Sequence, residues 1–273
     1  MAGTGGFVHH LISATIFAAA ACACFITFVL LQPGQRLDAE ALGATLLDMP
    51  IEVQLQVYGS LRAWSIVVLG GITVILSCAA LLRGQERLVV LTFFSCLGAA
   101  GGADLLSLAL WRPDLGVQSY AYNTWPSGHV ASVCVLALAS LRLLPKRTPW
   151  RPTYSLLAVV AVTVAGYAST ASFAHRPSDS VGAVLLCGAV FALTREAAPQ
   201  HYRRCWSTML VLPVAAASAV LLVSPAALAP EDPESALALA WLLAMFGAAC
   251  WVLVPEGVVG YDRRPQRRRT ASS

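Results

Sequence analysis

The chain has 273 residues, of which 58% are hydrophobic and only 12% are charged, and its net charge is +4. A soluble domain usually carries about a quarter charged residues, so this composition argues against a soluble globular protein and predicts an all-α integral membrane protein. The positive charge follows a pattern typical of membrane topology, so nucleic-acid binding is not expected.

Eight apolar runs approach the length of about 20 residues that a helix needs to cross a bilayer. They cover residues 11–31, 63–82, 88–111, 129–144, 153–174, 180–194, 207–229 and 236–255. The first run lacks a preceding basic region and extends to about Leu31, so we expect a retained helix and not a cleaved signal peptide. The fourth and sixth runs are short, and each follows a polar motif, so we expect their first turns to lie at the membrane interface.

The basic residues alternate between the two sides that these eight helices define. With the N-terminus in the cytoplasm, the inner segments hold 14 of the 18 basic residues and the outer segments hold 4. The inner residues are Arg83, Arg87, Arg142, Lys146, Arg147, Arg151, Arg195, Arg203, Arg204, Arg263, Arg264, Arg267, Arg268 and Arg269. Because basic residues favour the cytoplasmic side, this split predicts a multi-pass protein of the cell membrane with both termini in the cytoplasm.

Four segments follow from this count. Residues 1–62 hold the first helix and a long outer loop, 63–195 a helical core, 196–260 two further helices, and 261–273 a basic cytoplasmic tail. Within the loop from about 32 to 62, Leu42, Leu46 and Met49 have the spacing of one helix face, which predicts a short helix on the membrane surface. That helix would be a lid, a guide for lipid entry, or a packed connector.

Two short polar motifs stand immediately before apolar runs on the predicted outer side. They are Pro126-Ser127-Gly128-His129 and His175-Arg176-Pro177-Ser178-Asp179. A helix N-terminus has unpaired N–H groups and a positive dipole end, which favour a phosphate. We expect Ser127 to cap its helix and Gly128 to let the backbone approach an oxyanion, so that both contact a bound phosphate.

The remaining polar residues of the motifs suit phosphate-ester hydrolysis. Asp179 lies one helical turn after His175 and can hold one ring N–H, which makes the other nitrogen a better nucleophile. His175 would attack phosphorus and form a phosphohistidine, and His129 would protonate the leaving oxygen and later activate water. Arg112 and Arg176 would neutralise the phosphate oxygens. This chemistry needs no metal and no cofactor.

The motifs resemble those of the type 2 phosphatidic acid phosphatases, or lipid phosphate phosphatases, whose fold core is shared with vanadium haloperoxidases and bacterial acid phosphatases. That family's motifs read K-x6-R-P, P-S-G-H and S-R-x5-H-x3-D. Here Arg112-Pro113 matches the end of the first, residues 126–129 match the second, and His175 with Asp179 matches the end of the third. The resemblance implies a six-helix phosphatase-like core with two additional C-terminal helices, and a lipid phosphate as substrate.

The chain departs from the family pattern at two cations. The lysine of the first motif would fall at Leu105, and the serine and arginine of the third would fall at Ala168 and Ser169. Arg176, directly after the predicted nucleophile, is expected to compensate in part.

Three functions remain open from the residues. The first is a phosphatase acting on a phosphomonoester or pyrophosphate of a lipid at the outer membrane face. The second is a catalytically silent protein that binds lipid phosphates or scaffolds the envelope, which the two missing cations favour. The third is a transporter, for which Asp104 within an apolar run is the main support. The identity of the lipid and the oligomeric state are left open.

Overall fold

The computed structural model describes residues 4–117, 122–146, 148–195 and 233–258. Within these ranges the chain is all-α, with eight α-helices, a π-helical continuation of the first, and no strand. The elements are α1 (Thr4–Phe25), η1 (Ile26–Leu30), α2 (Gln32–Glu40), α3 (Ile51–Leu82), α4 (Glu86–Ala109), α5 (Gly128–Leu143), α6 (Arg151–Ala171), α7 (Pro177–Leu193) and α9 (Pro233–Val258). The helix expected at 207–229 and the basic tail lie outside the described residues.

Five of these helices are long and apolar enough to cross a membrane. They cover Val8–Leu30, Ile51–Leu82, Glu86–Ala109, Arg151–Ala171 and Glu234–Gly257. The other two apolar helices, α5 and α7, have 16 and 17 residues and are shorter than a usual span. This agrees with the short fourth and sixth runs of the sequence.

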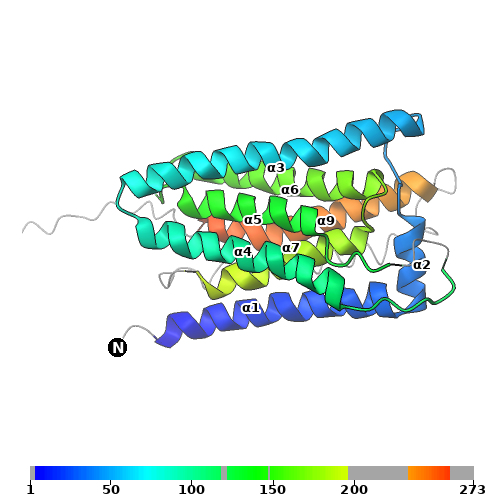
Figure 1. Ribbon diagram of the computed structural model, residues 1–273, viewed down its shortest axis with the longest axis horizontal. Helices are drawn as coiled ribbons and strands as arrows, with labels where there is room; N and C mark the ends of the chain where they lie inside the picture. Colours follow the sequence, from blue (N-terminus) through cyan, green and yellow to red (C-terminus); the bar gives the residue numbers. More distant parts are fainter. Residues whose placement is uncertain (1–3, 118–121, 147, 196–232, 259–273) are drawn as a thin grey trace, which may run out of the picture.

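The long helices lie side by side in one bundle, and α2 crosses one end of it (Figure 1). Helix α5 is the central element, because it packs against α3, α4, α6, α7 and α9. Nearly every residue of α5 from Val130 to Leu143 is buried. In contrast, α3 and α4 expose large apolar side chains such as Trp64, Ile75 and Phe94. Such an apolar surface is unfavourable in water, but it is not unfavourable in the hydrocarbon interior of a membrane.

The segment between the first two long helices differs from the sequence prediction. A short helix is present, but it is α2 at Gln32–Glu40, and the predicted helix through Leu42 and Met49 is absent. Gly43 adopts a left-handed conformation with φ of 85°, which cannot continue a right-handed helix. Residues 41–50 instead form a loop fixed by Gln54, whose Nε2 donates to the carbonyl oxygens of Gly43 and Ala171 at 2.9 and 2.8 Å.

Helix α3 begins at Ile51 and not near residue 63 as predicted. Its first turns carry polar residues, including Glu52, Gln54 and Arg62, that interrupt the apolar run in the sequence. Buried Gln54 faces the bundle and Arg62 reaches the end of α6. These polar residues are therefore part of the helix because neighbouring elements supply their partners.

Helix α9 belongs to the main core of the bundle. Its residues Met245, Ala249 and Leu253 are buried in the same apolar cluster as α5 and α7. At one end of the bundle Glu256 also accepts from Arg142 at the end of α5, at 3.2 Å, and from Arg195 after α7, at 2.8 Å. The last described helix is thus integral to the packing of the helices that carry the motifs.

Candidate functional site

The two polar motifs lie together at the end of the bundle that α2 crosses, which we name the motif end (Figure 1). The backbone N–H of Ser127 donates to the carbonyl oxygen of Asp179 at 3.0 Å, so the two motifs are joined directly. Helices α5 and α7 both begin here, as the sequence predicts. Their N-terminal N–H groups therefore face the same region, where an anion is favoured.

Ser127 caps α5, as expected, because its hydroxyl oxygen accepts from the backbone N–H of Val130 at 3.3 Å. Gly128 is the first residue of α5, and a side chain there would require the exposed side chain of Asp104 to shift. A Cβ placed there would overlap a carboxylate oxygen of Asp104 from α4. The first turn of α5 thus already faces an anionic group of the protein itself.

His129 is held by α3. Its Nε2 lies 2.9 Å from the carbonyl oxygen of Arg62. A carbonyl oxygen can only accept, so Nε2 carries the proton in this arrangement and Nδ1 is the nitrogen left for other partners. His129 lies in the first turn of α5 and His175 directly precedes α7, so the hydrogen bond between Ser127 and Asp179 brings the segments that carry the two predicted catalytic histidines together.

His175 and Asp179 have the expected relative position, but they are not in direct hydrogen-bond contact. The His175 Nδ1 atom lies 3.7 Å from Oδ2 of Asp179, which is longer than a hydrogen bond. That oxygen accepts instead from the hydroxyl of Thr124 and from the backbone N–H of Arg176 at 3.0 Å. Asp179 is fully buried, whereas the His175 side chain is 18% exposed.

The two predicted phosphate-binding arginines are both buried at the motif end. Arg176 is completely buried, and its Nη1 donates to the hydroxyl of Thr124 at 3.3 Å. Arg112 is 8% exposed and lies near enough to Asp38 to favour the charged form of that carboxylate. Both arginines therefore have interactions within the protein, and their contact with a substrate phosphate stays a prediction.

The structure adds Asp38, which the sequence placed only in an outer loop. Asp38 is fully buried, and its carboxylate accepts from the backbone N–H and the hydroxyl of Ser178 at 3.0 and 2.7 Å. Burial, followed by the negative charge of Asp179, raises the pKa of Asp38 to about 7. No local sequence pattern identifies Asp38 as part of the motif end, because its partner Ser178 is 140 residues away along the chain.

The positions of the two missing family cations differ in their surroundings. Leu105 on α4 is 68% exposed, so a longer side chain there would project from the bundle surface. Ser169 is fully buried near the end of α6, and its carbonyl oxygen accepts from the backbone N–H groups of Ala174 and His175 at 3.1 and 3.2 Å. The hydroxyl of Ser169 has no hydrogen-bond partner among the described residues.

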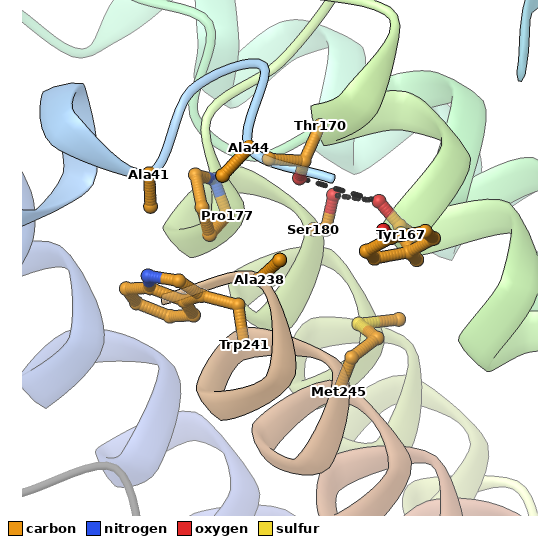
Figure 2. Close-up of a pocket in the computed structure, with 10 residues that line it drawn as sticks. Ala41, Ala44, Tyr167, Thr170, Pro177, Ser180, Ala238, Trp241 and Met245 are labelled. Carbon is orange, nitrogen blue, oxygen red and sulfur yellow. Dashed lines mark hydrogen bonds between the residues drawn. The ribbon is translucent and has the colours of Figure 1, made fainter. Parts of the chain in front are cut away.

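One side of the motif end is closed by α9. Figure 2 shows Trp241 and Met245 of α9 facing Pro177 at the start of α7 and Thr170 near the end of α6. The space between them has a volume of about 10 Å³, which is room for about one water molecule. The described residues on this side of the motifs therefore pack closely around this small space.

The other side carries an apolar groove between α3 and α6, with a volume of about 340 Å³. It runs from Leu61 and Val164, near the motif end, to Ile72 and Tyr154. Eleven residues of helix separate the two ends, which corresponds to roughly 16 Å. Its lining is almost wholly hydrocarbon, so it suits an alkyl or isoprenoid chain and not a polar molecule.

The sequence matches no protein-family model and no curated protein, and the fold matches no solved structure.

Proposed function

We propose that this chain is an integral membrane phosphatase that removes phosphate from a lipid phosphomonoester or pyrophosphate. One observation carries the proposal: a hydrogen bond between Ser127 and Asp179 joins the starts of the two helices beside which His129 and His175 lie, and Asp179 lies 3.7 Å from His175. Packing alone does not require histidines at helix N-termini. Helix N-termini favour an anion, so the positions of both histidines support a phosphate-binding role.

The chemistry would run in two steps through His175. Because Nδ1 of His175 faces Asp179, Nε2 is the nitrogen that attacks phosphorus while the bond from phosphorus to the ester oxygen breaks. A protonated His129 gives its proton to the departing oxygen. His129 then takes a proton from water, the resulting hydroxide attacks phosphorus, and the phosphorus–nitrogen bond breaks to release inorganic phosphate and free His175.

Two features support a lipid as substrate. The apolar groove starts beside the motif end, so a phosphate held there would leave a hydrocarbon chain next to a hydrocarbon surface. The five long apolar helices support a location in the membrane. Arg83, Arg142, Arg151 and Arg195 lie at the end opposite the motifs, which under the positive-inside rule favours an outward-facing site in the cell membrane.

Phosphate release by the purified, detergent-solubilised chain tests the proposal. The substrates are phosphatidate, phosphatidylglycerophosphate and a polyprenyl pyrophosphate, each in the presence of EDTA. We expect release by wild type, no release by His175→Ala, and unchanged release by His9→Ala, which removes an exposed histidine at the opposite end. Equal release by wild type and His175→Ala would reject the mechanism.

A second function is a catalytically silent protein that binds or scaffolds lipids, and one observation favours it. The carboxylate of Asp104 stands against Gly128, where the phosphate is expected. A negative charge there opposes phosphate binding. Absence of release from every lipid by wild type would favour this function.

A further inference from the structure

We propose that Arg62 of α3 binds the substrate phosphate and supplies the cation that the third motif lacks. This inference rests on the proposed function and deepens it. It concerns a residue outside all three motifs, in a helix apolar enough to cross a bilayer. A charge within such a helix is costly and usually has a functional partner.

Arg62 lies between the two catalytic motifs. Its carbonyl oxygen holds His129, and its Nη1 donates to the hydroxyl of Ser172 at 3.2 Å. Ser172 ends α6 and stands three residues before His175. The backbone of Arg62 therefore contacts one predicted catalytic histidine, and its guanidinium reaches the turn that carries the other.

The guanidinium of Arg62 has no anionic partner in the described part of the chain. Its only side-chain bond there goes to a neutral hydroxyl, and its Nε is buried without a hydrogen-bond partner. A partly buried cation without a counter-charge is less favourable than one to which an anion binds. Arginine has a planar set of donors that matches phosphate oxygens, so a phosphate is the anion that this geometry suits.

Arg62 reaches the turn where the family pattern expects an arginine. That arginine would fall at Ser169, and the hydroxyl of Ser172 bonds to the carbonyl oxygen of Ser169 at 3.4 Å. The cation at this turn thus comes from α3 and not from α6. The apolar groove begins at the neighbouring residues Leu61 and Ser65, so a phosphate at Arg62 would have its hydrocarbon chain beside the same helix.

The test compares Arg62→Met with wild type, because Met has a similar length and suits an apolar helix; Arg62→Gln replaces it if Arg62→Met does not give a monodisperse protein. Arg36→Gln is the control, because Arg36 is an exposed arginine in α2 at the same end. Two quantities are measured: kcat/KM for the lipid that wild type hydrolyses fastest, and the rise in Tm that inorganic phosphate produces. We expect Arg62→Met to lower kcat/KM about 100-fold, as loss of one donor to a developing oxyanion does.

The thermal measurement separates phosphate binding from a structural role. In phosphate-free buffer Arg62→Met should melt at or above the wild-type temperature, because it removes an uncompensated cation, whereas loss of a structural contact would lower Tm. Phosphate should raise the Tm of wild type and Arg36→Gln but not of Arg62→Met.

Each outcome decides one of the two proposals. If wild type is active and Arg62→Met keeps kcat/KM within threefold and keeps the rise with phosphate, the role of Arg62 is rejected and the phosphatase stands. If wild type releases no phosphate, but inorganic phosphate raises the Tm of wild type and not of Arg62→Met, the phosphate site stands and the phosphatase is rejected. If wild type shows neither release nor a rise, both are rejected.

Discussion

Asp38 caps α7 by accepting two hydrogen bonds from Ser178, one from the backbone N–H at 3.0 Å and one from the hydroxyl at 2.7 Å. Helix α2 is therefore fixed to the helix that carries the third motif. An acidic group at the N-terminus of a helix is favoured by the helix dipole. Here the carboxylate is also fully buried and close to Asp179, which opposes its ionisation.

Asp38 should make the stability of the protein depend on pH. Its pKa is about 7 in the folded chain and about 4 in an unfolded one, so the folded state binds more protons between these values. The free energy of unfolding should then fall as the pH rises from about 4 to about 7. Arg112 and Asp179 face the same carboxylate, and Cys24 of α1 interacts with it electrostatically.

Asp38→Asn keeps an acceptor for the backbone of Ser178 but cannot ionise, so Tm should vary less between pH 4.5 and 7.5 than in wild type. The control is Glu40→Gln, which removes an exposed carboxylate at the end of the same helix. An unchanged pH dependence of Tm in Asp38→Asn would show that another group titrates in this range.

Gly128→Ala should destabilise the protein by about 1 kcal/mol, because the new methyl group forces the carboxylate of Asp104 out of its position. In the double variant with Asp104→Ala, the cost should largely disappear, since the two side chains are in contact and their effects are not additive. Thermal unfolding of the four proteins of this cycle measures the coupling. Gly102→Ala is the control, because a Cβ there meets open space, and it should not lower Tm.

Asp104→Asn should strengthen phosphate binding. The substitution removes a negative charge from the start of α5, where the dipole would otherwise favour the substrate phosphate. A change of about 1 kcal/mol corresponds to a KM roughly fivefold lower for a lipid phosphate. Asp114→Asn, in an exposed loop at the same end, should leave KM unchanged. A higher KM in Asp104→Asn would instead indicate that Asp104 assists the substrate.

Thr124→Val should lower kcat about 10-fold while preserving the fold. Valine has nearly the same shape, but it cannot donate to Asp179 or accept from Arg176. Hydrogen bonds to charged groups contribute roughly 1.5–3 kcal/mol, and Asp179 would lose one of the contacts that orient it beside His175. The steady-state kcat and KM of Thr124→Val are compared with those of Thr15→Val, whose hydroxyl bonds only within α1. Equal kcat values would mean that Thr124 does not position Asp179.

The start of a helix was predictable where an apolar run follows a clear polar motif. Helix α5 begins at Gly128 and α7 at Pro177, as the motifs indicate, because a cap and a proline act locally. The start of α3 was missed by about a dozen residues, since Gln54 and Arg62 look polar in sequence and find partners only in the fold.

The motifs also predicted that the candidate residues lie at one end of the bundle, whereas their catalytic roles stay predictions. His129, His175 and Asp179 stand in contiguous motifs, and the structure brings them to one end. Asp38 and Arg62 contact the motif segments from distant parts of the chain, so no spacing in the sequence reveals them.

Glu256 forms ion pairs with Arg142 at the end of α5 and with Arg195 after α7, and these pairs bear on how the bundle assembles during synthesis. Arg142 and Arg195 are synthesised long before Glu256, yet Glu256 is the carboxylate with which both are paired in the finished bundle. A nascent chain that ends after α7 and Arg195 therefore contains both arginines but not yet that carboxylate. The last described helix must therefore be synthesised before the end of the bundle opposite the motifs acquires these ion pairs.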